Sequence, residues 1–196
     1  MRRSNSRGRA GSGPPLPRRV RIIGGQWRSR QLPVAAVPGL RPTPDRVRET
    51  LFNWLQPVLP GARCLDLYAG TGVLGLEAAS RGAQSVYLVE RDPVALTALN
   101  NSVSMLAADR VRVVGHDVLS WLMGEASPFD VVFVDPPYDQ ALAEPTCAAL
   151  AAAWLAPGAR IYLETDSEAG DARLPNHWQL LHETSAGQVR ARLFRV

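Results

Sequence analysis

The chain has 196 residues, of which 46% are hydrophobic and 20% charged. That size and composition suit one globular domain with a small appendage and exclude a large multidomain assembly. No apolar run is long enough to span a bilayer, and no hydrophobic segment follows the basic start as a signal peptide requires, so we expect a soluble, cytoplasmic protein without membrane contact. The two cysteines and three histidines show no ligand spacing, so we expect neither a disulfide nor a bound metal.

The positive charge is concentrated near the N-terminus. All 22 basic residues are arginine, and residues 1–48 hold 12 of them against a single acid, Asp45. Residues 49–196 carry 10 arginines and 17 acids. Such a block favours attraction to a polyanion, because a planar guanidinium can bind two phosphate oxygens at once. The alternative is a tail that serves only solubility.

The first part of the chain divides into a tail and an arm. Residues 1–19 combine Arg, Ser, Gly and Pro with little apolar content, which predicts a disordered tail. Short β-type runs on both sides of Gly24-Gly25 predict a β-hairpin within residues 20–34, and with its linker it forms an arm of residues 20–40. The hairpin is too small to fold alone and should pack on the main domain, residues 41–196. The hairpin arginines Arg21, Arg28 and Arg30 are the candidates to bind the phosphates of such a polyanion.

The main domain begins with an amphipathic helix and continues as alternating strands and helices. Thr43 supplies an N-cap and Pro44 a first-turn proline, after which apolar residues recur at helical spacing up to Val58. Strands are expected at residues 63–69, 85–90, 111–114, 129–134 and 159–164. Strands separated by helical crossovers run parallel, which predicts a doubly wound, Rossmann-like α/β sheet. Residues 178–183 and 188–196 have no helix between them and predict a closing antiparallel hairpin.

A glycine-rich loop follows the first strand of this sheet. Gly70-Thr71-Gly72-Val73-Leu74-Gly75 matches the G-x-G-x-x-G pattern of nucleotide-binding folds. Glu90 ends the second strand, where a carboxylate can accept both ribose hydroxyls. A tight turn with a surface acid is the alternative. The register of strand, loop, helix and acid favours a nucleotide-like ligand.

Acidic residues indicate which nucleotide is bound. Asp66 lies at the end of the first strand, where it would repel the pyrophosphate of NAD but attract the ammonium and sulfonium of S-adenosylmethionine. An Asp66 satisfied by backbone N–H groups is the alternative. Asp117 adds a carboxylate near the expected adenine amino group, and Val118 follows it. A surface aspartate opening the next helix explains Asp117 equally well.

The most specific motif is Asp135-Pro136-Pro137-Tyr138, directly after the buried run of residues 131–134. The carboxyl end of a central strand is where open α/β sheets bind ligands. The Asp135 carboxylate and the Pro136 carbonyl can accept hydrogen bonds from one exocyclic amine, while Tyr138 stacks on the base. Two acceptors on the amine hydrogens favour a pyramidal nitrogen whose lone pair faces the methyl group. An ordinary Asp-Pro turn is the alternative.

The sequence resembles bacterial 16S ribosomal RNA guanine-N2 methyltransferases of the small-subunit methyltransferase D type. The resemblance extends over residues 20–196. It rests on Arg21-Ile22-Ile23-Gly24-Gly25, Arg41-Pro42-Thr43, Asp45-Arg46-Val47-Arg48-Glu49, Leu51-Phe52-Asn53-Trp54-Leu55, Leu65-Asp66-Leu67-Tyr68-Ala69-Gly70-Thr71-Gly72, Gly75-Leu76-Glu77-Ala78, Ser80-Arg81-Gly82-Ala83 and Asp135-Pro136-Pro137-Tyr138. The arginine-rich residues 1–19 depart from the family pattern, so no role is transferred to them.

The resemblance implies a class I S-adenosylmethionine-dependent methyltransferase acting on one guanine of 16S rRNA in the assembling 30S particle. Arg41 and Thr43 are then candidates to hold the carboxylate of the cofactor's methionine. The catalytic set is Asp135, Pro136 and Tyr138. The cofactor set is Arg41, Thr43, Asp66, Tyr68, Gly70, Gly72, Glu90, Asp117, Val118 and Asp135.

Three other functions remain open. An amino-methyltransferase for adenine N6 in RNA or DNA would use the same Asp135 motif, although the chain lacks room for a DNA-recognition domain. A ribosome assembly factor that has lost catalysis is disfavoured by the complete motif set. An NAD oxidoreductase is disfavoured by Asp66. We expect the protein to act as a monomer.

Overall fold

A seven-stranded sheet forms the centre of the computed structural model, which describes residues 19–37, 43–168, 170 and 172–196. The strand order is β5-β4-β3-β6-β7-β9-β8. The first five strands of the sheet along the chain run parallel to one another. They are β3 (Arg63–Leu67), β4 (Ser85–Glu90), β5 (Val111–Gly115), β6 (Phe129–Val134) and β7 (Leu155–Asp166). The doubly wound sheet predicted from the sequence is confirmed.

The sheet ends in an antiparallel hairpin, as predicted. Strand β9 (Val189–Arg195) lies between β7 and β8 (Gln179–Ala186) and is antiparallel to both. Strand β7 begins at Leu155, earlier than expected, because Leu155 pairs with Phe129 before the register shifts and Arg160 pairs with Val131.

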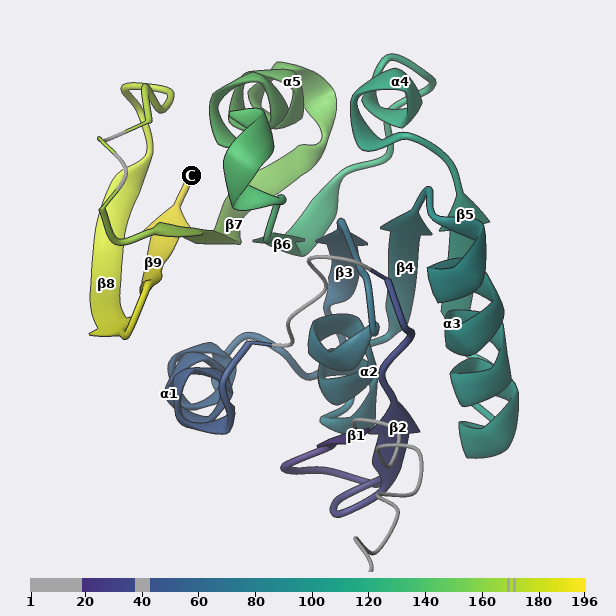
Figure 1. Ribbon diagram of the computed structural model, residues 1–196. Helices are drawn as coiled ribbons and strands as arrows, with labels where there is room; N and C mark the ends of the chain where they lie inside the picture. The colour runs from purple at the N-terminus through teal and green to yellow at the C-terminus, as the bar shows by residue number, and fades with distance from the viewer. Residues whose placement is uncertain (1–18, 38–42, 169, 171) are drawn as a thin grey trace, which may run out of the picture.

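Helices cover both faces of the sheet (Figure 1). One face carries α1 (Asp45–Leu55), α2 (Val73–Ser80) and α3 (Pro93–Leu106), and the other carries α4 (Val118–Leu122) and α5 (Ala143–Ala153). A short 3₁₀ turn, η1 (Tyr138–Gln140), follows β6. Since both faces are covered, the central strands bury side chains on both sides; in β6, Phe133 joins one core and Val132 the other.

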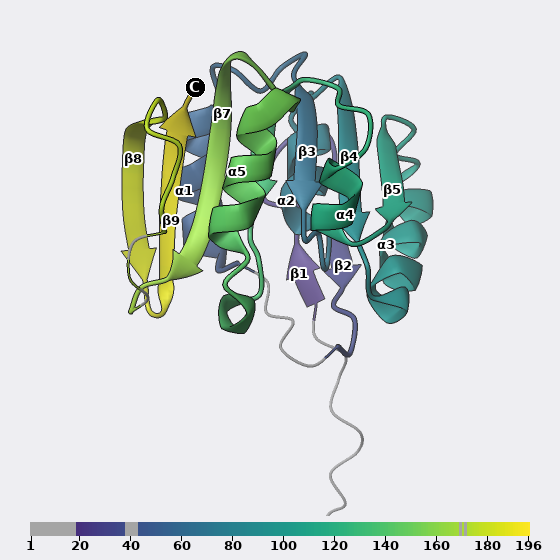
Figure 2. The ribbon, with the colours of Figure 1, turned by 90° about the horizontal axis from the view of Figure 1, so that it is seen from above.

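The N-terminal hairpin is built from β1 (Arg19–Arg21) and β2 (Gln31–Pro33), with Val20 opposite Leu32. In Figure 2 it lies at the end of the molecule toward which the arrowheads of β3 and β4 point. Val20, Leu32, Ile22 and Trp27 are buried in the same core as α1 and α2. The hairpin thus shares the core of the main domain. The tail expected at residues 1–19 lies outside the described residues, apart from Arg19.

Buried charges fasten this hairpin to the helices. The Glu77 carboxylate of α2 accepts hydrogen bonds from the backbone N–H groups of Ile23 and Gly24, at 2.6 and 2.7 Å. The Arg48 guanidinium of α1 lies 3.7 Å from Glu77, with both side chains fully buried, and it donates to the Arg21 carbonyl at 3.0 Å. One polar network therefore connects α1, α2 and the hairpin.

The start of α1 differs from the prediction. Thr43 is not the N-cap of α1: Pro44 occupies that position and no side chain caps the helix. The Thr43 hydroxyl faces Asp135 instead, so it is unavailable to the helix. The cysteines, Cys64 in β3 and Cys147 in α5, are buried and free, as expected. Within the described ranges, no helix is long and apolar enough to cross a membrane.

Candidate active site

The candidate site lies where β3 and β6 meet. These neighbouring parallel strands pair Asp66 with Phe133 and Leu67 with Val134, so the loops that follow them emerge side by side. After β3 the chain first adds β4 and β5 on one side of β3, and it then returns to add β6 on the other side. Such a reversal of strand order opens a crevice at the carboxyl ends of the strands, where α/β sheets bind ligands.

The loop after β3 requires unusual backbone conformations. Gly70 and Gly72 have φ values of 53° and 72°, which favour glycine. Tyr68 has φ 62° although it carries a side chain, and its hydroxyl lies 2.6 Å from Oγ1 of Thr146 in α5. A strained residue held by a distant partner is typical of a functional loop. The sequence reasoning did not foresee this strain.

Asp66 points from β3 toward the first turn of α2. Its Oδ2 atom accepts a hydrogen bond from the Gly75 backbone N–H at 2.8 Å, and only 2% of the residue is exposed. A Cβ at position 75 would collide with Leu88, so glycine allows α2 to approach the sheet. Burial raises the pKa of Asp66 to about 8, the hydrogen bond from Gly75 opposes this shift, and the charge of Glu90 adds to it.

Glu90 connects the ends of β3 and β4. One carboxylate oxygen accepts from the Gly70 N–H and the other from the N–H groups of Arg91 and Asp92, each at 2.8 Å. Glu90 therefore fixes the glycine-rich loop relative to the start of α3. This loop-fastening role was not part of the sequence expectation, which concerned ribose hydroxyls.

Asp117 is the N-cap of α4. Its Oδ1 accepts from the Ser120 N–H at 3.1 Å and its Oδ2 lies 3.4 Å from an Arg91 nitrogen. The hydrogen bonds of Ser120 and the charge of Arg91 outweigh burial and lower the pKa of Asp117. The adjacent Val118 is buried. A capping role is thus present, and the carboxylate stays ionised beside the glycine-rich loop.

The Asp135 motif follows β6 as expected. Desolvation of its carboxyl group, together with the charges of Glu164 and Asp66, raises the pKa of Asp135 well above the usual value. The Thr43 hydroxyl contact opposes this shift. Within the part of the chain that the structure describes, no hydrogen bond ends on the Pro136 carbonyl, so it can accept one.

Tyr138 presents its ring beside this loop. It is 42% exposed, and its hydroxyl donates to Oε1 of Glu164 at 2.8 Å. Burial and the Glu164 charge raise the pKa of the Tyr138 phenol, which keeps the phenol protonated as a donor. The sequence reasoning named Glu164 only as the end of a strand. An acid in an otherwise apolar strand, at its carboxyl end, was the signal that could have found it.

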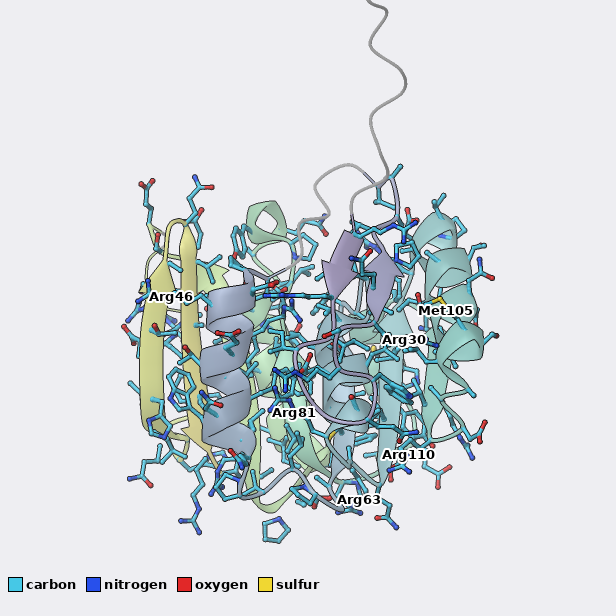
Figure 3. All side chains as sticks on the ribbon, turned by 90° about the horizontal axis from the view of Figure 1, so that it is seen from below. Arg30, Arg46, Arg63, Arg81, Met105 and Arg110 are labelled. Atoms are coloured by element: carbon cyan, nitrogen blue, oxygen red, sulfur yellow. The ribbon has the colours of Figure 1, made fainter. Side chains whose placement is uncertain are left out.

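The remaining predicted residues are Arg41, Thr43 and the three arginines of the hairpin. Arg41 is outside the described residues. Thr43 is buried, close to Asp135. All three hairpin arginines are exposed, and Arg21 pairs with Asp45 at 2.9 Å. Figure 3 shows Arg30 on the face that carries the hairpin and α1.

The acidic groups converge without forming a metal site. Asp66, Asp135 and Glu90 belong to three neighbouring strands or the loops after them, and their charges influence one another. Among the residues described, no group of three or more ligating side chains could hold a metal ion. A ligand with positive charge and hydroxyl donors would complement this arrangement.

Comparisons with known proteins show which family the chain belongs to. A family model, "Conserved hypothetical protein 95", matches residues 20–195. Ribosomal RNA small subunit methyltransferase D of Escherichia coli K12 is 49% identical over 177 residues, covering 90% of this chain and 89% of the relative. The protein of the same name from Haemophilus influenzae is 42% identical, with 90% and 93% covered.

Solved structures of related proteins share the fold of this chain. The structure of yhhF from Escherichia coli superposes with a TM-score of 0.84 at 47% identity, covering 90% of this chain and 97% of that one. A protein from Thermus thermophilus superposes with a TM-score of 0.74 at 34% identity, with 90% and 99% covered. From its site, its fold and these matches together, the chain belongs to the ribosomal RNA small subunit methyltransferase D family.

Proposed function

We propose that this protein transfers a methyl group from S-adenosylmethionine to the exocyclic N2 of a guanine in 16S rRNA, within the assembling 30S subunit. The observation that carries the proposal is the Asp135–Tyr138 loop, placed at the strand crossover beside the glycine-rich loop. The names of the relatives support a ribosomal RNA substrate of the small subunit.

The donor set fits S-adenosylmethionine. Asp66 is a buried carboxyl with a raised pKa, so a neighbouring cation would stabilise its ionised form. Glu90 offers acceptors for ribose hydroxyls, and Asp117 an ionised acceptor for an adenine amino group. When bound, S-adenosylmethionine supplies an electrophilic methyl group on a sulfonium. Gly70 and Gly72 give the loop beside this site positive φ angles that other residues rarely adopt.

The Asp135 loop acts on the base. The Asp135 carboxylate and the Pro136 carbonyl accept hydrogen bonds from the two hydrogens of the guanine N2, and Tyr138 stacks on the ring. These acceptors favour a pyramidal nitrogen with an available lone pair. The Asp135 carboxylate, whose pKa is raised, then takes the proton that the nitrogen releases. Holding the reacting groups in line supplies most of the rate, an effect on the order of 7–11 kcal/mol.

The hairpin is proposed to hold the RNA backbone. Arg28 and Arg30 are exposed on it and can bind phosphates, which position a substrate without reading its sequence. The open groove of about 310 Å³ between the hairpin and the start of α1 is lined by Arg19 and Thr43, among others, and Thr43 contacts Asp135. RNA bound along the hairpin would therefore lie next to the Asp135–Tyr138 loop.

The test maps methylation in the ribosome. 16S rRNA from a strain lacking this gene should lack one N2-methylguanine by mass spectrometry, and purified protein with S-adenosylmethionine should restore it on isolated 30S particles. The Asp135→Ala variant should restore nothing. Methyl transfer to adenine N6 would replace this proposal with the alternative enzyme, and unchanged rRNA in the deletion strain would refute it.

A further inference from the structure

A buried carboxylate outside the predicted site joins two tyrosine hydroxyls. Glu164, at the carboxyl end of β7, is only 3% exposed. Its Oε1 accepts from the Tyr138 hydroxyl at 2.8 Å and its Oε2 from the Tyr162 hydroxyl at 2.7 Å. Each oxygen of this buried acid thus has its own phenolic donor, which offsets the cost of removing the charge from water.

The two tyrosines differ in their surroundings. Tyr162 is fully buried, lies two residues before Glu164 on the same face of β7, and packs edge-on against Phe133 with ring centroids 6.3 Å apart. Tyr138 lies in the short 3₁₀ turn η1 and is 42% exposed. Tyr162 therefore fixes the carboxylate from the rigid sheet, and the carboxylate in turn holds a ring that projects from a short turn.

We propose that Glu164 is a positioning residue that fixes the Tyr138 ring as a rigid platform for the target base. The turn that carries Tyr138 has three residues, too few to restrain a half-exposed ring by backbone hydrogen bonding alone. A single charge-assisted hydrogen bond at the far end of the ring restricts rotation about both side-chain torsions. A ring that is already ordered costs less entropy when a base stacks on it.

This inference rests on the proposed function, because it assigns Tyr138 the base-stacking role. It adds a residue from a different strand to the substrate side of the site. Strand β7 follows β6 in the sheet, and Val134 pairs with Leu163, so the register brings Glu164 alongside Asp135. The Glu164 carboxylate can therefore order the Tyr138 ring while its charge acts on the Asp135 carboxyl group.

The first test removes one end of the hydrogen bond at a time. Tyr138→Phe keeps the ring and loses only its hydroxyl, and Glu164→Gln keeps the size of the side chain and loses its charge. Each should lower kcat for methylation of 30S particles about tenfold, equivalent to about 1.4 kcal/mol. On the plateau of the pH profile, the double variant should be no slower than Tyr138→Phe, because Glu164→Gln acts on the ring through the contact that Tyr138→Phe already removes. Tyr87→Phe, on another strand, is the matched control and should retain the full rate.

The second test observes the ring directly, without RNA or cofactor. The chain has four tyrosines, so ¹³C-labelled tyrosine rings give few NMR signals to assign. The Tyr138 signals should show greater ring mobility in Glu164→Gln than in the unmodified protein, while those of Tyr87 should not change. Melting temperatures identify any loss of fold in Glu164→Gln, and Tyr138→Phe, which alters an exposed ring, remains decisive if that occurs.

The outcomes separate this inference from the proposed function. Full activity in Tyr138→Phe, multiplicative losses in the double variant, or an unchanged Tyr138 ring in Glu164→Gln would each overturn the role of Glu164. Absence of 16S rRNA methylation by the unmodified protein would instead overturn the proposed function, and the NMR result would still decide whether Glu164 orders the ring.

Discussion

The hydroxyl oxygen of Thr43 lies 3.5 Å from Oδ2 of Asp135, across 92 positions of sequence. This long contact joins the segment that enters α1 to the loop that follows β6. Thr43 is buried, so its hydroxyl is largely shielded from water. The segment before α1 therefore contributes to the electrostatics of the Asp135–Tyr138 loop, in addition to any contact with the cofactor.

The pH dependence of the reaction should report on Asp135. Its pKa is raised by burial and by the charges of Glu164 and Asp66, and lowered by the Thr43 hydroxyl. Since the carboxylate form is the acceptor, kcat should fall as the pH decreases through this raised pKa. Thr43→Val should move the acid limb to higher pH, because it removes a stabilising contact. Glu164→Gln should move it to lower pH, because it removes a negative charge.

These two opposite shifts are measured from kcat at saturating substrate on one RNA preparation. The unmodified protein and the Tyr87→Phe variant should share one profile. Shifts in the same direction, or profiles that coincide for all variants, would show that another group controls the acid limb.

Cofactor binding should release a proton through Asp66. With a pKa of about 8, this carboxyl is mostly protonated at neutral pH in the free protein. A cation bound beside it favours the ionised form, so binding at pH 7 should be accompanied by proton release. Calorimetry in buffers of different ionisation enthalpy measures the number of protons. The release should be absent in Asp66→Asn and retained in the exposed control Asp109→Asn; unmodified protein that binds without proton exchange would contradict the role of Asp66.

The same shift links Asp66 to stability. Its folded-state pKa of about 8 exceeds the ordinary value of 3.8, so the stabilisation associated with the protonated form is complete below about pH 3.8. It is lost progressively as the pH rises toward 8. Asp66→Asn should therefore flatten the pH dependence of the unfolding free energy in this window.

The sequence predicted the elements that depend on local periodicity. Strands β4 and β6 have their predicted bounds because apolar runs and their flanking turns are local signals. The placement of Asp66, Glu90 and Asp135 at one edge of the sheet followed from the parallel topology alone. These features need no knowledge of side-chain packing.

Contacts between distant segments could not be predicted in this way. The sequence could single out Glu164 as an acid in a strand, but its contact with Tyr138 follows only from the register of β6 and β7. Glu77 and Arg48 look like solvent-exposed positions of amphipathic helices until the hairpin covers them. The local sequence of Thr43 and Pro44 predicts an N-cap at Thr43. In the structure the Thr43 hydroxyl contacts Asp135 instead, and local sequence does not indicate that tertiary contact.

Glu90 should affect both the cofactor and the loop. Replacing it with Ala removes a proposed ribose acceptor, and losing one charged hydrogen bond costs about 1.5–3 kcal/mol, so affinity for S-adenosylmethionine should fall at least tenfold. It also removes the acceptor of the Gly70 N–H, so the melting temperature should decrease. Glu49→Ala, at an exposed position, should change neither. Unchanged affinity by calorimetry would exclude Glu90 from the cofactor site.

Glu77 should be essential for stability and not for chemistry. Replacing it with Ala removes one of the two carboxylates near the buried Arg48, whose other partner is Asp45 at 2.6 Å, and removes the acceptor of two hairpin N–H groups. Breaking a buried ion pair in this way costs about 3–5 kcal/mol of unfolding free energy. Chemical denaturation measures the loss, with the exposed Glu125→Ala as control. A loss no larger than that of the control would mean that Glu77 does not stabilise the docking of the hairpin.

The hairpin arginines should control the salt dependence of RNA binding. Removal of residues 1–34 is a poor test, because it would take Val20, Leu32 and other buried side chains out of the shared core. Single substitutions avoid this problem. Arg28→Ala and Arg30→Ala should each flatten the dependence of log affinity on log salt by about 0.7–0.9. Arg21→Ala should have a smaller effect, because Arg21 already pairs with Asp45 at 2.9 Å.

A matched control exists on the edge strand β5. Arg112 is exposed and its guanidinium lies 5.8 Å from the ring centre of Tyr87, which packs against the core on the α4 and α5 face. Arg112→Ala removes the same charge from the protein at a distance from the hairpin, so its salt dependence should match that of the unmodified protein. Affinity for S-adenosylmethionine should be unchanged in all four variants, because phosphate contacts do not involve the cofactor site. If Arg28→Ala and Arg30→Ala gave the same slope as Arg112→Ala, the hairpin would not be the surface that binds the RNA backbone.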